Sequence, residues 1–493
     1  MSAQDRYIST GISGLDEILT GGLLPGRLYL VEGEPGTGKT TTALQFLAEG
    51  ARHGESVLYI TLAESEVELR AVAKSHGWSM DGIHIHEVIG DERLLDASQQ
   101  YTMFHPAEVE MGDTIQKILR VVTERKPARV VLDSLSELQL LAENPLRYRR
   151  QVLALKQFFA HQNCTAFFLD DRTGKNGDLQ VRSIAHAVLL FEQEAKDYGS
   201  ERRRMRVVKY RGVAFRGGFH DYKIVRGGIV IYPRLVASDT RVLEKRDQIK
   251  SGLARLDTLL GGGLEAGTST LIAGPPGTGK SSLASQFVHA ALKRGERAAM
   301  FLFEESTNNL LNRSAALKLD LREYMDSGKL TIVQVDPAEL SPGEFLHIVC
   351  QMAVDGAKVI VIDSVNGFKN AMPDERLLTT HLHELVTFLG QRGVLTLLVG
   401  VQQGMLGNAS STELDTSYLA DNIIMLRYFE AAGEVKQAVA VFKKRGGYHE
   451  RTLRSFALTA RKGIEVGSVL RQFHGVLTGV PQLNGAVPED NGD

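Results

Sequence analysis

A short glycine-rich motif, GPPGTGKS, spans Gly274–Ser281 and lies between two segments of different character. The apolar run 269–273 predicts a buried strand, and the amphipathic pattern over 282–293 predicts a helix. In this context the glycines let backbone N–H groups surround phosphate oxygens, and the helix N-terminus adds partial positive charge. Lys280 is expected to reach the terminal phosphates, and Ser281 to ligate Mg²⁺. The motif therefore predicts a nucleoside triphosphate site.

The same motif occurs a second time, as GEPGTGKT over Gly33–Thr40, and 274 − 33 gives an offset of 241 residues. Further landmarks recur in the same order: Thr10–Asp16 with Ser251–Asp257, Ala63–Ser65 with Glu304–Ser306, Val130–Ser134 with the run ending at Asp363-Ser364, and Lys209–Gly212 with Lys443–Gly446. The nucleotide-binding residues predicted from the two motifs are Gly36, Thr37, Gly38, Lys39, Thr40, Thr41, Gly277, Thr278, Gly279, Lys280, Ser281 and Ser282. The chain is therefore an internal repeat of two homologous domains.

Each repeat alternates short β-branched runs with longer helical patterns, which predicts an α/β fold with a mainly parallel sheet and flanking helices. In the second repeat, strands are expected near 270–273, 298–303, 330–335, 359–362 and 395–399, with a helix over 377–389. We expect domains at 1–237 and 238–483, joined by a charged linker, and a disordered tail over 484–493. The first repeat carries about 11 additional residues (241 − 230), which we place in 91–111.

The composition is that of a soluble globular protein, with 43% hydrophobic and 24% charged residues and a formal net charge of −2. The absence of a basic excess argues against constitutive nucleic-acid binding. No run of about 18 apolar residues predicts a membrane span, and the polar N-terminus lacks a signal-peptide core. The two cysteines, Cys164 and Cys350, are expected to be core residues. We therefore expect a cytoplasmic protein.

Two aspartates end apolar strands after the glycine-rich motifs. Asp133 and Asp363 are expected to hold the Mg²⁺ shell, together with the Thr40 and Ser281 hydroxyls. The alternative is an ordinary helix N-cap, which is common for an aspartate between a strand and a helix.

Triphosphate chemistry also needs a carboxylate to orient or deprotonate the attacking group. Glu304 and Glu305 follow the strand expected over 298–303, and adjacent carboxylates there suit this role. The first repeat has Ala63 and Glu64 at these positions, so one carboxylate is missing. A solvated strand end is the alternative interpretation.

Late in each repeat a Lys and an Arg are two residues apart: Lys209 with Arg211, and Lys443 with Arg445. Alternate strand residues face one side, so each pair is expected to act on one target, such as the γ-phosphate of a neighbouring subunit. A solvated edge strand is the alternative. The basic run Arg202–Arg206 is interpreted as a solvated face, with nucleic-acid contact as the weaker alternative.

Together, the tandem motifs, the entry sequence TGISGLD, the Glu304-Glu305 pair and the sequence FKKRG at 442–446 resemble the KaiC family of circadian-clock proteins. The resemblance covers residue 5 to about residue 480. It implies two RecA-like ATPase domains, a homohexamer of two stacked rings, and ATP with Mg²⁺ bound between subunits in both rings. It further implies slow hydrolysis by the first ring, and Ser/Thr autokinase and autophosphatase activity in the second.

The resemblance also implies roles for particular residues. Glu304 corresponds to the general base, and Glu305 supports it. The Lys–Arg pairs correspond to residues that reach ATP on the adjacent subunit. The family's Ser-Thr phosphorylation pair aligns with Ser417 and Tyr418, with Thr416 as a nearby substitute acceptor.

Three departures from the family pattern change these expectations. Tyr418 replaces the family threonine, which argues against the usual two-site cycle, and Ala63 leaves Glu64 as the only carboxylate of its pair. The chain also lacks the longer tail of family members that respond to KaiA, so KaiA regulation is not expected. A KaiB-like protein or a two-component signalling protein is the partner that the resemblance suggests.

Two other functions are compatible with the sequence. A RecA-like DNA-dependent ATPase, acting in recombination or unwinding, would share the core and use the basic run 202–206. A nucleotide-gated scaffold would use hydrolysis only to time the docking of a partner.

Overall fold

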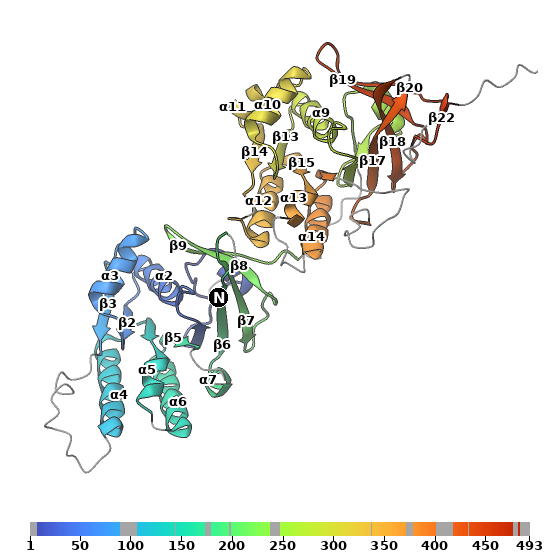
Figure 1. The fold of residues 1–493 in the computed structure, drawn as a ribbon. Helices are drawn as coiled ribbons and strands as arrows, with labels where there is room; N and C mark the ends of the chain where they lie inside the picture. The colour runs from blue at the N-terminus through green and yellow to red at the C-terminus, as the bar shows by residue number, and fades with distance from the viewer. Residues whose placement is uncertain are drawn as a thin grey trace, which may run out of the picture. The chain divides into compact units, whose positions relative to one another are not determined.

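The computed structural model describes residues 7–88, 106–142, 144–172, 179–196, 199–236, 247–336, 338–370, 378–400, 418–431, 433–476 and 482–483. The chain forms two compact units, Met1–Arg234 and Leu235–Asp493, and Figure 1 shows the elements of each. The predicted tail over 484–493 and most of the predicted insertion over 91–111 lie outside the described residues.

The first unit is built on a nine-stranded sheet in the order β3-β2-β4-β5-β1-β6-β7-β8-β9. The strands β3, β2, β4, β5, β1 and β6 run parallel to one another. The strands β7, β8 and β9 extend the sheet beyond β6 in antiparallel pairs. The strands are β1 Leu28–Gly33, β2 Val57–Thr61, β3 Ile83–Glu87, β4 Arg129–Asp133, β5 Thr165–Asp171, β6 Ala187–Glu194, β7 Arg202–Tyr210, β8 His220–Val225 and β9 Gly228–Tyr232. The helices are α1 Leu15–Ile18, α2 Lys39–Arg52, α3 Glu66–Ser75, α4 Pro106–Arg125, α5 Leu135–Leu140, α6 Pro145–His161 and α7 Leu179–Ile184.

The second unit repeats this topology, with the sheet order β14-β13-β15-β16-β12-β17-β18-β19-β20. Its main strands are β12 Ser269–Ala273, β13 Arg297–Leu302, β14 Leu330–Gln334, β15 Ala357–Asp363, β16 Leu395–Gly400, β17 Asn422–Ala431, β18 Glu434–Lys444, β19 Arg454–Thr459 and β20 Gly463–Val469. Short strands form two further pairs, β10 Gln248–Ile249 with β11 Leu264–Glu265 and β21 Phe473–His474 with β22 Gln482–Leu483. The helices are α8 Ala254–Leu259, α9 Lys280–Lys293, α10 Thr307–Ala316, α11 Arg322–Asp326, α12 Pro342–Val354, α13 Val365–Asn370 and α14 Leu378–Gln391.

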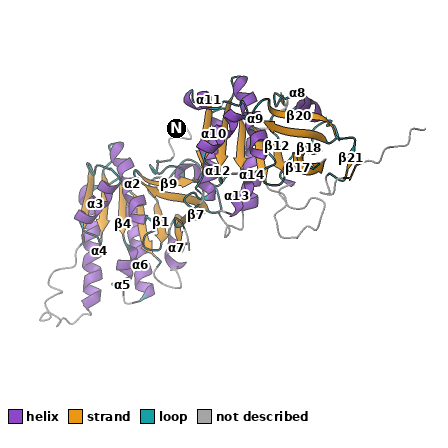
Figure 2. Ribbon diagram, turned by 45° about the horizontal axis from the view of Figure 1, so that its top comes forward, coloured by secondary structure: helices purple, strands orange, loops and turns teal. Residues whose placement is uncertain are grey.

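Each sheet is buried on both faces by helices, which explains why its central strands are continuous apolar runs. Along β1, Tyr29 and Val31 pack into one core cluster with residues of α2 and α3, whereas Leu28 and Leu30 pack into another with residues of α4, α5 and α6. Figure 2 shows helices on both sides of the strands in each unit. The predicted α/β fold, two tandem domains with mainly parallel sheets, is therefore confirmed.

The five strands expected in the second repeat correspond to β12–β16, and the helix expected over 377–389 corresponds to α14. The strands β17–β20, which follow β12 in the sheet order, were not specified by the sequence reasoning. β17 is parallel to β12, whereas β18, β19 and β20 pair antiparallel and are partly exposed, so they lack the long apolar runs of the central parallel strands. None of the described helices is long and apolar enough to cross a membrane.

A buried histidine in β8 predicts that the first unit loses stability in mild acid. His220 is 1% exposed, and its Nδ1 accepts the Arg234 N–H at 2.8 Å while Nε2 contacts the Arg216 carbonyl at 3.0 Å. Burial, with help from the charges of Arg216 and Arg234, lowers the pKa of His220 to about 4.

The folded state favours the neutral ring. The contribution of His220 to the free energy of unfolding is therefore complete above pH of about 6.5 and decreases as the pH falls towards about 4. Between pH 7.5 and 5 the expected loss is about 2 kcal/mol of unfolding free energy. Urea unfolding followed by the fluorescence of Trp78, the only tryptophan, measures it. His220→Asn should have a smaller loss over this range, and equal losses would contradict the assignment.

Candidate functional site

The two glycine-rich motifs form turns at the carboxyl ends of β1 and β12 and lead into α2 and α9. The Thr37 hydroxyl donates to the Glu34 carbonyl at 2.7 Å, and Thr278 donates to the Pro275 carbonyl at 2.8 Å. Lys39 and Lys280 begin the helices and are buried. Each turn therefore presents a lysine, a hydroxyl and a helix N-terminus at one edge of the sheet, as phosphate binding requires.

The glycine before each lysine is required by the backbone and by close packing. Gly38 has φ +88° and Gly279 has φ +91°, in the left-handed region that favours glycine. A Cβ at Gly38 would lie 2.8 Å from Ile224 Cδ1, and one at Gly279 would lie 2.7 Å from Leu458 Cδ1. The turns therefore lie directly against β8 and β19.

The two strand-end aspartates lie beside the hydroxyls that follow the motif lysines. Thr40 Oγ1 is 3.5 Å from Asp133 Oδ2, which also accepts the Tyr59 hydroxyl. In the second domain the Ser281 hydroxyl bonds to Asp363, and Asp363 Oδ2 is buried with no hydrogen-bond partner. Burial raises the pKa of both carboxyls. A hydroxyl paired with a buried, incompletely bonded carboxylate fits Mg²⁺ held jointly by protein and nucleotide.

In the second domain, different side chains hold the two adjacent glutamates. Ser364 Oγ donates to Glu304 Oε1 at 2.8 Å and accepts the Gly367 N–H at 2.9 Å. Arg313 forms a 2.7 Å ion pair with Glu305. Burial lowers the pKa of Lys280, and the negative charges of Asp363 and Glu304 act against this shift. Glu304 therefore lies within the electrostatic reach of the phosphate-binding lysine, whereas Glu305 is partly neutralised by Arg313.

The first domain places its carboxylates differently. Ala63 is exposed and has no carboxylate, and Glu64 Oε2 is buried without a hydrogen-bond partner. Burial raises the pKa of Glu64, and the nearby charges of Asp133 and Asp171 add to the increase. Asp171, at the end of β5, forms a 2.6 Å ion pair with Lys39. The sequence reasoning missed Asp171, although the sequence Leu169-Asp170-Asp171 at the end of an apolar run was the available signal.

Both Lys–Arg pairs lie at the opposite edge of the sheet from the phosphate-binding turns. Lys209 pairs with Val188, the second residue of β6, and Lys443 pairs with Ile423, the second residue of β17. Since β6 and β17 run parallel to β1 and β12, their first residues lie at the edge where those strands begin. About 13 Å of strand separates this edge from the turn after β12, at ~3.3 Å per residue.

At that edge each basic pair contacts its own domain. Lys209 donates to the carbonyl oxygens of Arg182 and Ser183, and Arg211 donates to the Ser183 carbonyl at 2.6 Å. Lys443 donates to the Ala420 carbonyl at 2.8 Å, and Arg445 pairs with Asp421 at 3.2 Å. The structure therefore does not place a Lys–Arg pair at the phosphate-binding turn of the same domain.

The segment expected to accept phosphate is described only in part. Ser417 and Thr416 lie outside the described residues, whereas Tyr418 is 53% exposed and precedes β17. Leu419 and Ala420 are buried, and Asp421 Oδ2 accepts the Ser269 N–H at 3.1 Å. Tyr418 is therefore anchored at the same sheet edge as Lys443.

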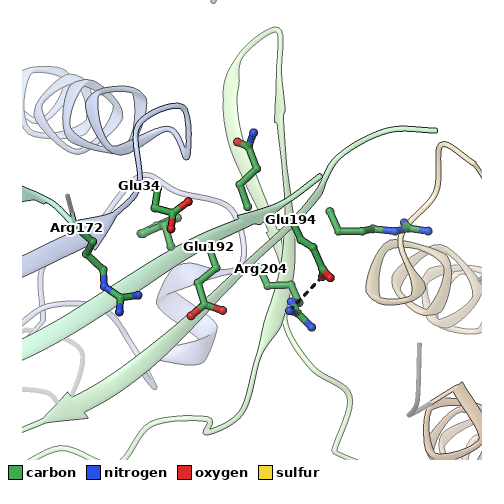
Figure 3. Close-up of a pocket in the computed structure, with 8 residues that line it drawn as sticks. Glu34, Arg172, Glu192, Glu194 and Arg204 are labelled. Atoms are coloured by element: carbon green, nitrogen blue, oxygen red, sulfur yellow. Dashed lines mark ion pairs between the residues drawn. The ribbon is translucent and has the colours of Figure 1, made fainter. Parts of the chain in front are cut away.

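Beside the first glycine-rich turn lies a cavity of about 210 Å³, shown in Figure 3. Its lining combines acidic and basic side chains: Glu34, Arg172, Phe191, Glu192, Gln193, Glu194, Arg202 and Arg204. Arg204 pairs with Glu194 at 3.5 Å, and the guanidinium groups of Arg204 and Arg206 both lie 5.0 Å from the Phe219 ring centre. Arg203 pairs with Glu201 at 2.6 Å. The arginines of the basic run thus contact their own domain, which weakens the case for nucleic-acid binding.

Comparison with known proteins is consistent with this geometry. The family model described as "ATPase: KaiC" matches residues 8–236 and again residues 249–470. The chain belongs to the KaiC family. Among KaiC relatives, the circadian clock protein KaiC3 of Synechocystis sp. is 29% identical over 482 residues, which cover 96% of this chain and 94% of that protein. The circadian clock oscillator protein KaiC of Thermostichus vulcanus is 28% identical over 490 residues, covering 97% and 92%.

Membership of the KaiC family supports ATP binding and ATPase activity, and both nucleotide motifs fall within the matched ranges. The residues that fit Mg²⁺ are Thr40 with Asp133 and Ser281 with Asp363, through the contacts given above. The sequence identified the glutamates of both domains, but not Ser364 and Arg313, which hold the two glutamates of the second domain. Hydroxyl and guanidinium groups are too common in sequences to be assigned to a site without a structure.

Proposed function

We propose that the protein is a KaiC-like ATPase whose second domain is a Ser/Thr autokinase and autophosphatase, acting in circadian or related timing. The observation that carries this proposal is the separation of its parts between the two edges of the second sheet. Lys280, Glu304 and Asp363 lie at the carboxyl end of the parallel strands, whereas Tyr418 and Lys443 lie at the amino end. This separation of about 13 Å along the strand supports phosphate transfer between neighbouring subunits over transfer within one domain.

Two subunits placed side by side would remove this separation. The amino-end edge of the sheet in one subunit could then meet the carboxyl-end edge in the next. Head-to-tail contacts form a closed ring when the rotation between neighbouring subunits closes. In such a ring every site is completed by the next subunit. We therefore propose a homohexamer of two rings, in which Lys209 and Arg211, and likewise Lys443 and Arg445, reach ATP on the neighbouring subunit. A KaiB-like protein or a two-component signalling protein is the proposed partner, and KaiA regulation is not proposed.

In the proposed reaction Lys280 contacts the β- and γ-phosphates, and the Ser281 and Asp363 oxygens would hold Mg²⁺. When bound, Mg²⁺ neutralises charge that develops on the phosphate oxygens. Glu304, held by Ser364, accepts the proton of the attacking hydroxyl while that oxygen bonds to the γ-phosphorus and the bond to the β-bridging oxygen breaks. Ser417 is the proposed acceptor, with Thr416 and Tyr418 beside it.

Mixing two variants tests transfer between subunits. Lys280→Ala removes ATP binding from the second domain but keeps the acceptor, whereas Ser417→Ala removes the acceptor and keeps the ATP site. Neither variant alone should carry phosphate at Ser417, and the mixture should carry it on the Lys280→Ala chain, as phosphopeptide mapping would show. Absence of phosphate from 412–418 in the wild-type protein, with ATP hydrolysis intact, would refute the kinase proposal.

Ser364→Ala is expected to lower turnover by the second domain about tenfold, because it removes a hydrogen bond to the Glu304 carboxylate. The first domain offers a matched control in Ser134, which is buried at the same position but has Ala63 in place of Glu304. Ser134→Ala should change turnover by the first domain less than twofold. Steady-state ATP hydrolysis measures each effect separately. Lys39→Ala silences the first domain when Ser364→Ala is assayed, and Lys280→Ala silences the second when Ser134→Ala is assayed. Equal losses for both serines would contradict the role given to Ser364.

A further inference from the structure

The first domain holds its phosphate-binding lysine in a way that the second domain cannot. Lys39 Nζ lies 2.6 Å from Asp171 Oδ1, and it also donates to the carbonyl oxygens of Gly33 at 2.9 Å and Glu34 at 3.0 Å. Its side chain is 8% exposed, whereas that of Asp171 is 30% exposed. At the corresponding place (171 + 230) the second repeat has Val401, which has no carboxylate. A carboxylate at the end of β5 that pairs with the lysine is therefore a feature of the first repeat, since the second has Val401 at this position.

The sheet register places Asp171 between the two parts of the nucleotide site. β5 lies between β4, which ends at Asp133, and β1, which leads into the glycine-rich turn. Asp171 is the parallel partner of Gly33, and its N–H donates to Ser136 Oγ at 2.9 Å. Because the lysine of this motif contacts the β- and γ-phosphates, a carboxylate in contact with it lies beside the γ-phosphate position. This is where a water molecule attacking that phosphate must be oriented.

The distribution of carboxylates suggests why the first domain has this residue. In the second domain the acidic groups whose charges act on Lys280 are Asp363 and Glu304. In the first domain Ala63 removes one of them, and the groups whose charges act on Glu64 include Asp133, Asp171 and Lys39. The first domain thus has a carboxylate from β5 in an ion pair with its lysine, whereas the charges that act on Lys280 come from Asp363 and Glu304.

We propose that Asp171 is a catalytic carboxylate of the first domain, replacing the one absent at Ala63. This inference rests on the proposed hydrolysis of ATP by that domain. When ATP is bound, Lys39 contacts the phosphates, and Asp171 is left to orient the attacking water. The water oxygen bonds to the γ-phosphorus, the bond to the β-bridging oxygen breaks to release ADP, and the proton of the water passes to Asp171 and then to solvent.

The test uses the full chain carrying Lys280→Ala, so that turnover comes from the first domain. In this background Asp171→Asn should lower kcat for ATP hydrolysis about 100-fold without raising KM, since a neutral amide cannot accept the proton. Asp170→Asn is the matched control, because it removes the same charge from the adjacent residue, whose side chain points to the opposite face and bonds to Ser136. The kcat of the Asp170→Asn variant should stay within about threefold of the kcat of its Lys280→Ala parent. Urea unfolding reported by Trp78 would establish that each variant is folded.

A rescue separates a catalytic role from a structural one. Ala63 is exposed, so Ala63→Glu can be accommodated, and adding it to Asp171→Asn should recover at least tenfold of the lost kcat. A higher KM with unchanged kcat in Asp171→Asn would mean that Asp171 only holds Lys39, and no rescue would likewise overturn the proposal. Absence of turnover in the Lys280→Ala parent would instead refute hydrolysis by the first domain, and the role of Asp171 with it.

Discussion

Glu304→Gln is expected to lower ATP turnover by the second domain about 10²- to 10⁴-fold, the usual contribution of a general base. Glu304 Oε1 accepts the neutral Ser364 hydroxyl, and the charge of Glu304 acts on Lys280 and Asp363. The amide has nearly the same shape but cannot accept a proton. Phosphate release and phosphopeptide formation in a Lys39→Ala background would measure the change.

The adjacent Glu305→Gln is the control within the same pair. Because Arg313 already neutralises much of the Glu305 charge at 2.7 Å, losing that charge should reduce turnover no more than about tenfold. Nucleotide affinity, measured separately by equilibrium binding, should change little in either variant. A larger loss for Glu305→Gln than for Glu304→Gln would reverse the assignment of base and supporting carboxylate.

Arg129→Ala is expected to destabilise the first domain by about 3 kcal/mol, because it removes a buried arginine that bonds to half-buried Glu55 and to two backbone carbonyls. Arg129 is 2% exposed, bonds to both carboxylate oxygens of Glu55 at 2.6 and 2.9 Å, and donates to the carbonyls of Ser9 and Phe46. Its removal leaves those carbonyls without this donor and opens a void above the Phe46 ring. Urea unfolding monitored by Trp78 fluorescence would measure the loss.

Two comparisons show whether burial causes this effect. Arg52→Ala removes an exposed arginine that pairs with Glu49, and it should cost less than about 1 kcal/mol. Arg129→Lys keeps the charge but cannot bond to Glu55 through two nitrogens and to both carbonyls together, so it should be intermediate. An Arg129→Ala loss as small as that of Arg52→Ala would contradict the buried network. The second repeat has Val359 at this position, so the network belongs to the first domain.

The sequence alone was sufficient to predict those structural features whose residues follow one another in the chain. The motifs at Gly33–Thr40 and Gly274–Ser281 each combine an apolar strand, a glycine-rich turn and a helix within about 25 residues, so their local geometry follows from neighbouring residues. The offset between the two copies then predicted the domain repeat, and apolar runs predicted β12–β16 because parallel strands are buried on both faces. The strands β17–β20 were not identified, and the antiparallel β18–β20 among them are partly exposed and have weaker patterns.

Contacts between distant segments could not be obtained in this way. The sequence shows Glu304 and Glu305 as equivalent neighbours, and only the fold brings Ser364 to one and leaves Arg313 to the other. Likewise, the sequence contains Asp171, but its ion pair with Lys39 depends on β5 lying next to β1.

The sequence by itself thus determined that there are two nucleotide-binding domains, and which residues form the phosphate-binding turns. Only the tertiary structure shows that Asp171 pairs with Lys39, that Asp363 and Glu304 lie near Lys280, and that the Lys–Arg pairs lie at the opposite edge of each sheet. The physical reason is the strand order: β4-β5-β1-β6 places side by side strands that are far apart in the chain, and parallel alignment fixes which ends meet.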